Sequence, residues 1–449
     1  MSDAFRDERV VVVGAGVAGA GVARVLTDQG ADVLVTELRP ADAVERAAEL
    51  HAMGVTLAAG GHERSHLDGA TLVVTSPGVP QDAPILGWAA ARHIPVWGEL
   101  ELGARLCTAP YLAVTGTNGK TTTTGMIASC LRAGGVDAVA CGNIGHPFVV
   151  AAREGYDALV VEASSFQLRF VETFRPRVSV LLNLAPDHLD WHGSDRAYAD
   201  AKANVFRAQG AGDTHVGNRD DASSSVSLQA PCPVVWFRLA APEPGEVGYA
   251  DDELVARMRG DAEDLGPVDG ERAGYRADAA AAAAAALAFG VSPEAVRRGL
   301  AAFVPAHHRG ETVALVDGVR FVDNSKATNV HATLAALDGV RDAVLIAGGR
   351  AKGVDLSPLR ARADRLVGVV AIGESARQVE AVFRDTVPVR VAGSIEEATK
   401  DAWDLARRPG TVLLAPACAS WDMFKDYAER GDRFAAAARA LIDVVDAHG

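Results

Sequence analysis

Residues 116–121, Gly-Thr-Asn-Gly-Lys-Thr, combine the residue types that bind nucleotide phosphates. They follow an apolar run, residues 111–114, that predicts a buried strand, and a helix is expected from Lys120 to Arg132. A glycine turn before a helix points N–H groups at an anion, a lysine reaches the terminal phosphates, and a threonine hydroxyl binds Mg²⁺. Val114 stands where the general phosphate-loop pattern has its first glycine, so this loop is a shorter form. The expected ATP ligands here are Gly116, Thr117, Asn118, Gly119, Lys120, Thr121 and Thr122.

Asn143, Glu162 and His188 each stand at or just after the end of an apolar run that predicts a strand. Ligands of an open parallel sheet lie beyond the carboxyl ends of its strands, so these residues are expected to converge on the phosphates held by Lys120. An acid that ends an apolar strand is rare without a partner, and Mg²⁺ bound by Glu162 and Thr121 is the obvious one. His188 is either an ordinary loop histidine or, beside two aspartates, a functional ligand.

A second glycine turn, GxGxxG at residues 14–19, lies near the N-terminus between an expected strand and an expected helix, and Glu37 follows a second strand. Taken alone, the pattern is typical of dinucleotide binding, with the acid on a ribose hydroxyl. The same turn can hold the diphosphate of a nucleotide sugar, and Arg39 suits a phosphate better than a ribose. The expected ligands of a UDP substrate are Gly14, Gly16, Val17, Ala18, Glu37 and Arg39, with Asn143 and His188.

Composition fits a globular enzyme: 449 residues, 49% of them hydrophobic and 23% charged, predict about three domains. The net charge of −14 argues against a nucleic-acid partner. The five cysteines lack CxxC spacing, and no apolar signal segment precedes residue 10, so we expect a cytoplasmic protein that does not enter a membrane. We also expect a monomer.

Alternating strand and helix patterns predict an α/β fold in three domains with mainly parallel sheets. Residues 1–100 predict a Rossmann-like nucleotide domain, residues 101–304 a central ATP-binding domain of the phosphate-loop type, and residues 305–449 a second Rossmann-like domain without GxGxxG. Residues 210–274 are rich in Ser, Gly, Pro and Asp and predict only short strands.

The motifs GTNGKTT, GNIG, EASSFQL, DHLD and AKANVF together resemble the Mur ligases, and SSFQL is similar to the D-glutamate-adding branch. The resemblance covers nearly the whole chain. It implies an ATP- and Mg²⁺-dependent ligase that adds D-glutamate to UDP-N-acetylmuramoyl-L-alanine through an acyl phosphate, in peptidoglycan precursor synthesis. It also implies that Lys202 reacts with CO₂ to form a carbamate, and that Lys120, His188 and Lys202 are catalytic, with metal ligands at Thr121, Glu162, His188 and Lys202. Spacing alone favours a solvated Lys202 on a helix over residues 194–208.

In the C-terminal domain the resemblance assigns the motifs SKATN, GGRAKG and ACASWDMF to the amino acid, and Arg309 to the ATP phosphates. Asp323 is expected at the ATP ribose, although the family often has its acid one residue later, at Asn324. Asp278 stands where the family has the second asparagine of HNxxNA. The expected amino-acid ligands are Lys326, Thr328, Lys352, Ser420, Trp421 and Tyr427.

Other functions stay open from the sequence. A nicotinamide-dependent oxidoreductase would explain residues 14–37 but would leave Lys120 and Glu162 without a role. A non-catalytic nucleotide-binding regulator would keep the fold and lose the chemistry. A related ligase would add L-glutamate, L-alanine or diaminopimelate instead.

Overall fold

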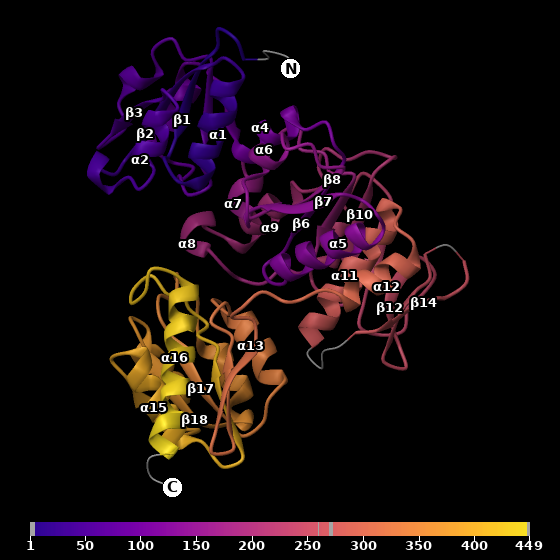
Figure 1. Ribbon diagram of the computed structural model, residues 1–449, viewed down its shortest axis with the longest axis vertical. Coiled ribbons are helices and arrows are strands. Elements are labelled where there is room, and N and C mark those ends of the chain that lie inside the picture. The colour runs from indigo at the N-terminus through magenta and orange to yellow at the C-terminus, as the bar shows by residue number, and fades with distance from the viewer. Residues whose placement is uncertain (1–4, 259, 269–272, 447–449) are drawn as a thin grey trace. The chain divides into compact units, whose positions relative to one another are not determined.

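The computed structural model describes residues 5–258, 260–268 and 273–446 (Figure 1). Contacts divide the chain into two compact units, each described by itself below. The first unit comprises residues 1–184, 196–269 and 277–303, and the second comprises residues 185–195, 270–276 and 304–449. Three sheets lie within the three sequence ranges that were predicted to form domains, which confirms the predicted α/β fold.

The N-terminal sheet is parallel throughout, in the order β3-β2-β1-β4-β5. The four valines 10–13 of β1 are fully buried, because successive side chains enter apolar clusters on opposite faces of the sheet. The elements are β1 (Arg9–Val13), α1 (Val17–Asp28), β2 (Asp32–Glu37), α2 (Ala47–Ala52), β3 (Thr56–Ala59), β4 (Leu72–Thr75), α3 (Pro84–Ala91) and β5 (Val96–Gly98), with 3₁₀ turns at Ala41–Ala43 and Arg64–Leu67.

The central sheet has the order β14-β13-β12-β11-β10-β9-β6-β8-β7 in the described part of the chain. Strand β6 lies between β8 and β9, and the chain leaves it toward β7 on one side and later adds β9 and β10 on the other. This reversal puts the end of β6 at the point where open α/β sheets bind ligands. The elements are α4 (Glu99–Leu106), β6 (Tyr111–Thr115), α5 (Lys120–Ala133), β7 (Ala138–Gly142), α6 (Phe148–Ala151), β8 (Ala158–Glu162), α7 (Ser165–Leu168), β9 (Val178–Leu181), α9 (Asp195–Ala203), β10 (Thr214–Asn218), α10 (Ser224–Ser227), β11 (Val234–Phe237), β12 (Glu246–Ala250), β13 (Glu253–Ala256), β14 (Glu263–Pro267), α11 (Ala273–Phe289) and α12 (Pro293–Ala301).

Two local predictions for this domain were incomplete. The helix expected to continue to residue 208 ends at Ala203, and the next side chain, Asn204, donates a hydrogen bond from Nδ2 to the carbonyl of Leu168 (2.8 Å). A side-chain amide bonded to a distant backbone group competes with helix continuation. Strands β12–β14 form an antiparallel extension of the sheet that composition did not indicate.

Helix α11 contains eight consecutive alanines, residues 279–286, and all of them are completely buried. Small side chains let neighbouring backbones approach closely, as Gly299 of α12 does against Cys130 of α5.

Within residues 5–258, 260–268 and 273–446, no helix combines the length and the apolar character needed to cross a membrane.

The C-terminal sheet has the order β15-β16-β20-β17-β18-β19, antiparallel only between β15 and β16 among its described strand pairs. Apolar clusters cover both faces. The elements of this unit are α8 (Leu189–His192), β15 (Glu311–Val316), β16 (Val319–Asp323), α13 (Val330–Asp338), β17 (Ala343–Gly348), a 3₁₀ segment (Ser357–Arg365), β18 (Leu366–Ile372), α14 (Ala376–Phe383), β19 (Val389–Val391), α15 (Ile395–Leu405), β20 (Gly410–Leu414) and α16 (Tyr427–Asp446).

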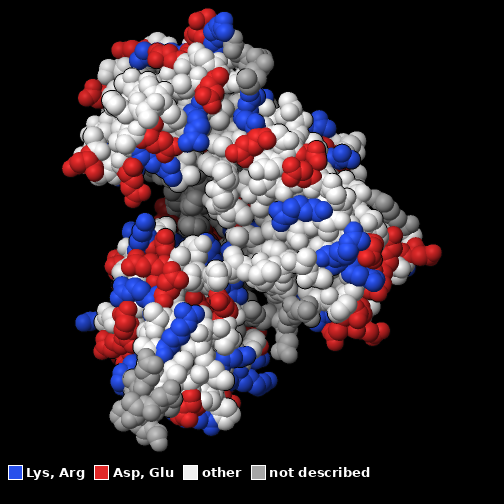
Figure 2. All heavy atoms as spheres, viewed as in Figure 1, with Lys and Arg blue, Asp and Glu red and all other residues white. Residues whose placement is uncertain are grey.

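Charged side chains of both signs are interspersed on the face shown in Figure 2. The described part of the chain has exposed ion pairs, such as Arg433 with Glu396 and Lys400 with Asp404. Exposed pairs of this kind contribute little to stability.

Candidate active site

The loop between β6 and α5 has the backbone geometry of a phosphate cradle. Gly116 has φ +153° and Gly119, which caps α5, has φ +83°, a conformation that side-chain-bearing residues rarely adopt. A Cβ atom added at Gly119 would also overlap the carboxylate of Asp278, which is on α11. Position 119 therefore requires glycine on both grounds, and Asp278 lies against the loop.

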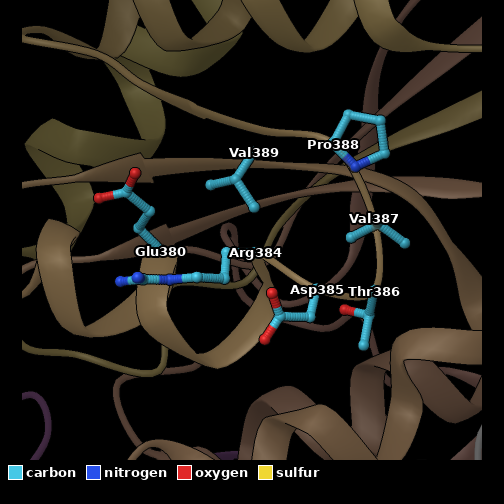
Figure 3. Close-up of a pocket in the computed structure, with 7 residues that line it drawn as sticks. All are labelled: Glu380, Arg384, Asp385, Thr386, Val387, Pro388 and Val389. Atoms are coloured by element: carbon cyan, nitrogen blue, oxygen red, sulfur yellow. The ribbon is translucent and has the colours of Figure 1, made fainter.

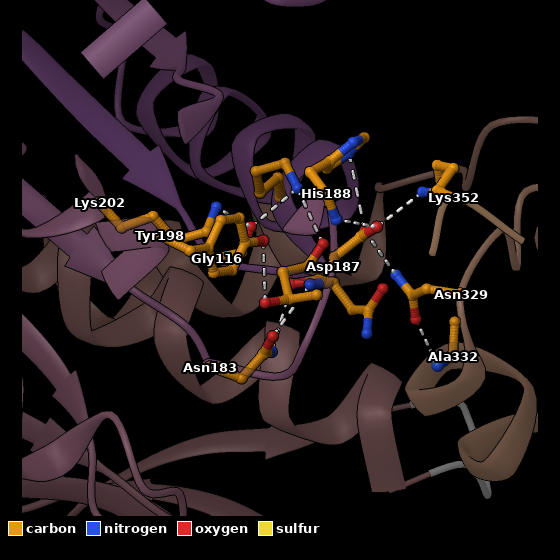
Figure 4. Close-up of polar contacts among 12 residues, drawn as sticks. Gly116, Asn183, Asp187, His188, Tyr198, Lys202, Asn329, Ala332 and Lys352 are labelled. Atoms are coloured by element: carbon orange, nitrogen blue, oxygen red, sulfur yellow. Dashed lines mark hydrogen bonds and ion pairs between the residues drawn. The ribbon is translucent and has the colours of Figure 1, made fainter. Parts of the chain in front are cut away.

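Two lysines, Lys120 and Lys202, donate to the carbonyl group of Gly116 in this loop. Figure 4 shows Lys202 beside Gly116. Lys120 Nζ lies 2.8 Å from the Gly116 oxygen and 2.9 Å from that of Thr117, and Lys202 Nζ lies 2.8 Å from the Gly116 oxygen. Lys202 is only 1% exposed, and its ammonium lies 4.6 Å from the ring centroid of Tyr198. The structure contradicts a solvated Lys202, because the packing of α9 directs the side chain under the phosphate loop.

Glu162, at the end of β8, is 2% exposed and accepts two side-chain hydrogen bonds. Thr121 donates from Oγ1 at 2.7 Å, and Asn143 donates from Nδ2 at 2.8 Å. The structure thus brings together Thr121 of the phosphate loop and two of the three residues that strand ends predicted, Asn143 and Glu162. Carboxylate and hydroxyl oxygens suit Mg²⁺, which usually takes one or two carboxylates and completes its shell with water and phosphate. Among the described residues, no cluster of three or more His, Cys, Asp or Glu side chains that could hold a metal occurs.

Asn183 was not predicted, yet it supports the phosphate loop from the neighbouring strand β9. Its Oδ1 accepts from the backbone N–H of Asn118 (2.9 Å), its Nδ2 donates to the carbonyl of Asn118 (3.2 Å), and its own carbonyl accepts from Thr117 (3.0 Å). Strand β9 ends at Leu181, so Asn183 lies just beyond the strand. The end of the strand releases Asn183 to bond the loop.

The N-terminal glycine turn borders a cavity of about 660 Å³. Gly16 has open space where a Cβ atom would stand, so backbone can approach a ligand there. The loop of residues 76–80 after β4 forms another wall, and Ser76 donates to the carbonyl of Gly14. Of the residues expected to bind a UDP substrate, the cavity is lined by Gly14, Gly16, Val17, Ala18 and Glu37.

Glu37 is held by its neighbours rather than left open to solvent. Its carboxylate accepts from the backbone N–H of Ala15 (2.9 Å) and forms an ion pair with Arg39 (3.2 Å). Burial alone would raise the pKa of Glu37, but the hydrogen bonds from Arg39 and Ala15 lower this pKa to about 2. Arg39 thus forms an ion pair with Glu37, and Asn143 donates a hydrogen bond to Glu162. Neither Arg39 nor Asn143 is among the residues that line this cavity.

In the second unit, Asp187 is the centre of a buried polar cluster (Figure 4). Its carboxylate accepts from Lys352 Nζ at 2.6 Å, from Asn329 Nδ2 at 3.2 Å and from the backbone N–H of His188 at 2.9 Å. His188 adopts a left-handed conformation, φ +53°, and its Nε2 lies 3.7 Å from the same carboxylate. Sequence spacing gave no sign of this pair, since 165 residues separate Asp187 from Lys352.

Arg430, also not predicted, connects the two loops that carry most of the expected amino-acid ligands. Its completely buried guanidinium donates to the hydroxyl (2.9 Å) and carbonyl (2.8 Å) of Ser325 and to the carbonyl of Cys418 (3.2 Å). Burial lowers the pKa of Arg430 to about 10, so it stays protonated at neutral pH. Beside it, the ammonium of Lys326 lies 3.6 Å from the ring centroid of Tyr427.

The remaining predicted residues differ in exposure. Ser420 is buried, Thr328 and Arg309 are half-buried, and Trp421 is 64% exposed. The carboxylate of Asp323 is buried and bonded to His308 Nδ1 (2.6 Å) and to the backbone N–H of Ser325 (2.9 Å). Its assignment to the ATP ribose stays a prediction that this geometry does not favour.

Known protein families match all three regions of the chain. The Mur ligase MurD-like N-terminal domain matches residues 8–98, the Mur ligase middle domain residues 114–243, and the Mur ligase glutamate ligase domain residues 308–418. The UDP-N-acetylmuramoylalanine–D-glutamate ligase of Frankia casuarinae is 46% identical over 96% of this chain and 94% of its own length. The chain belongs to the Mur ligase family. The ligase of the same name from Thermobifida fusca is 45% identical over 97% of this chain and 99% of its own length.

Solved Mur ligase structures share the fold at low identity. MurF from Acinetobacter baumannii has a TM-score of 0.63 at 16% identity, covering 96% of this chain and 91% of its own. UDP-N-acetylmuramate-alanine ligase MurC from Thermotoga maritima has a TM-score of 0.61 at 19% identity, covering 96% and 99%. Together with the domain matches, these likenesses confirm the three-domain α/β architecture that the sequence predicted for this Mur ligase.

Proposed function

We propose that the chain is an ATP-dependent ligase that joins D-glutamate to UDP-N-acetylmuramoyl-L-alanine in peptidoglycan precursor synthesis. The observation that carries the proposal is the presence, within the first unit, of a lysine-bearing phosphate loop at β6 and a separate cavity at the N-terminal glycine turn. A ligase of this kind needs two nucleotide sites, one for ATP and one for the UDP substrate. A nicotinamide-dependent oxidoreductase would leave the buried set around Lys120 and Glu162 without a role, so the geometry favours the ligase.

The first chemical step transfers the ATP γ-phosphate to the alanine carboxylate of the UDP substrate and forms an acyl phosphate. Lys120, which rests on loop carbonyls without nucleotide, turns its ammonium toward the transferring phosphoryl group and offsets its charge. The N–H groups at the start of α5 bind the phosphates that remain on ADP. Arg309 is proposed to contact the ATP phosphates as well.

Thr121 and Glu162 are the proposed ligands of Mg²⁺. Their oxygens already lie 2.7 Å apart, so both can face one cation after a small separation. A cation held by these residues would offset the negative charge of the ATP phosphates. Asn143, which donates to the other oxygen of Glu162, fixes the orientation of this carboxylate.

Lys202 is proposed to act as a carbamate. Together with His188 it is proposed to bind a second cation. The support is the burial of Lys202 against the phosphate loop, where an ammonium and a carbamate would have opposite effects on bound phosphate. A carbamate presents anionic oxygens, which hard cations prefer. A cytoplasmic setting and a monomeric state are further parts of the proposal, and light scattering at assay concentration tests the second.

The second chemical step belongs to the C-terminal domain. The amine of D-glutamate attacks the acyl phosphate and displaces phosphate through a tetrahedral intermediate. Lys352 and Ser420 are proposed to hold the carboxylates of D-glutamate, with Lys326, Thr328, Trp421 and Tyr427 around them. Arg430 holds the two loops together through its hydrogen bonds to Ser325 and Cys418.

The proposal is tested by measuring phosphate release with ATP, Mg²⁺ and UDP-N-acetylmuramoyl-L-alanine against a panel of amino acids. Release that depends on D-glutamate, and not on L-glutamate, L-alanine or diaminopimelate, is expected. Release with another amino acid alone would replace the substrate assignment, and no release with any of them would contradict the catalytic proposal.

A further inference from the structure

The amino-acid side of the second unit contains a cation, Arg350, that was not among the expected ligands although it lies within the GGRAKG motif. The loop after β17, residues 349–353, carries both Arg350 and Lys352. Both residues line one cavity of about 320 Å³, together with Ala351, Gly353, Asp190, Glu374, Ser375 and Gln378. The cavity is large enough for one amino acid, and its charged donors are these two side chains.

The two cations differ in how far their charge is balanced. The ammonium of Lys352 lies 2.6 Å from the Asp187 carboxylate, and the side chains are 6% and 7% exposed. The opposite charges of a buried pair at this distance largely cancel each other at a ligand outside the pair. Lys352 retains N–H donors for a carboxylate, because an ammonium has three, but it adds little net positive charge to the cavity.

Arg350 is exposed, and its guanidinium forms no hydrogen bond or ion pair within residues 5–258, 260–268 and 273–446. Its backbone is nevertheless fixed: the N–H donates to the Ala419 carbonyl at 2.9 Å, and the carbonyl accepts from the Ala419 N–H at 3.0 Å. This bridge places Arg350 opposite the residue that precedes Ser420. The side chain is therefore an uncompensated cation, anchored between two loops that the amino acid is expected to contact.

We propose that Arg350 is a specificity-determining residue whose guanidinium binds the side-chain carboxylate of the incoming dicarboxylic amino acid, while Lys352 binds its other carboxylate. The inference rests on the proposed function and names the group that selects the substrate. A planar guanidinium binds a carboxylate through two parallel hydrogen bonds, which an amide or an alkyl side chain cannot accept in the same way. The acids Asp190 and Glu374 on the same cavity attract the ammonium group of the amino acid and disfavour a third carboxylate.

The test compares the KM values for D-glutamate, ATP and the UDP substrate in a charge series at one position: Arg350→Lys, Arg350→Ala and Arg350→Glu. The KM for D-glutamate is expected to rise in that order, by about tenfold in Arg350→Ala, the lower end of what a charge-assisted hydrogen bond contributes. The KM for ATP and the thermal unfolding midpoint are expected to stay unchanged.

Arg384 supplies the matched control. It is an exposed arginine of the same domain that lines a different polar cavity, about 420 Å³, between α14 and β19 (Figure 3). Arg384→Ala should leave the KM for D-glutamate at the wild-type value.

An unchanged KM for D-glutamate in Arg350→Ala, in an enzyme that is otherwise active, overturns the inference and leaves the proposed function standing. A parallel rise of all the KM values overturns it as well, because that pattern indicates a structural role. Failure of the proposed function is a different result, since the wild-type chain would then release no phosphate in response to D-glutamate.

Discussion

The two glycine turns of the first unit share a strand–turn–helix pattern but have opposite electrostatic surroundings. At the central turn, the ammonium groups of Lys120 and Lys202 both lie 2.8 Å from the Gly116 carbonyl. At the N-terminal turn, Glu37 places a carboxylate 2.9 Å from the N–H of Ala15, and the described residues that line the adjacent cavity include no Lys or Arg.

The difference indicates what each turn can bind. A triphosphate with its metal needs a full positive charge, which Lys120 supplies at the central turn. The N-terminal turn offers backbone N–H groups at the start of α1 and a cavity with apolar walls, which suit a diphosphate linked to a base and a sugar. The glycine pattern alone predicts a phosphate near a helix, and the neighbouring side chains select the kind of nucleotide.

Replacing Lys120 by alanine tests the central turn and should have the largest effect. We expect turnover to fall by about 10²–10³-fold, comparable to the loss of one preorganised transition-state donor. Steady-state phosphate release measures the effect, and Lys400→Ala, at an exposed position paired with Asp404, serves as the control. Turnover within threefold of wild type would remove Lys120 from the mechanism.

Lys202 is the second lysine at the central turn, and we propose that it acts there as a carbamate. Lys202→Ala should lose about 10²-fold in turnover, a loss that small carboxylates such as acetate should partly restore if the modified side chain supplies oxygens. Lys202→Met keeps the packing against Tyr198, so it separates loss of the charge from loss of the fold. Full activity in the methionine variant, with an unmodified side-chain mass in the wild-type protein, would retire the carbamate proposal.

Gly16→Val tests the N-terminal turn. The new side chain enters open space, so the fold should persist, but it blocks the approach of a diphosphate to the backbone. We expect the KM for the UDP substrate to rise by about tenfold, roughly one lost hydrogen-bonded contact, with the KM for ATP unchanged. The matched change Gly119→Val should unfold or inactivate the enzyme, because that position faces Asp278 and has positive φ. The reverse pattern of KM changes would mean that the two nucleotide sites are exchanged.

Replacing Glu37 by glutamine should have the smallest effect of these changes, and the effect should be on the free energy of unfolding. Since its pKa in the folded protein is lowered to about 2 from 4.5, the folded state gains stability that is fully present above pH 4.5 and is lost as the pH falls toward 2. Relative to Glu37→Gln, the wild-type free energy of unfolding should be greater by about 1–2 kcal/mol at pH 7, an estimate reduced for the exposure of Arg39. Urea unfolding at pH 7 and pH 4 measures the difference, which should shrink at the lower pH. A difference independent of pH would mean that the charge of Glu37 is not what its partners stabilise.

The sequence could predict what is local. Buried strands such as β1 and β6, the glycine turns and the acid that ends β8 follow from apolar runs and turn chemistry within about 20 residues, so element types and the cluster of Thr121, Asn143 and Glu162 were found. The resemblance to the Mur ligases added the assignment of Lys202, whose burial no local pattern indicated.

Long-range pairing could not be predicted. The contact of Asp187 with Lys352 and the bonds from Arg430 to Ser325 join segments more than 100 residues apart, and each partner alone looks like an ordinary charged residue. The buried bond between Asp323 and His308 spans only 15 residues and was also missed, because neither side chain alone indicates it. Strands β12–β14 were missed because their polar and glycine-rich sequences, such as EDLGP in β14, carry no clear alternation.

Calorimetric titration can decide whether the two turns bind different nucleotides. ATP with Mg²⁺ and UDP-N-acetylmuramoyl-L-alanine are each titrated into the wild-type protein, Gly16→Val and Lys120→Ala. We predict that Gly16→Val weakens only the UDP substrate and that Lys120→Ala weakens only ATP. Loss of both ligands in both variants, or loss of ATP in Gly16→Val alone, would contradict the account.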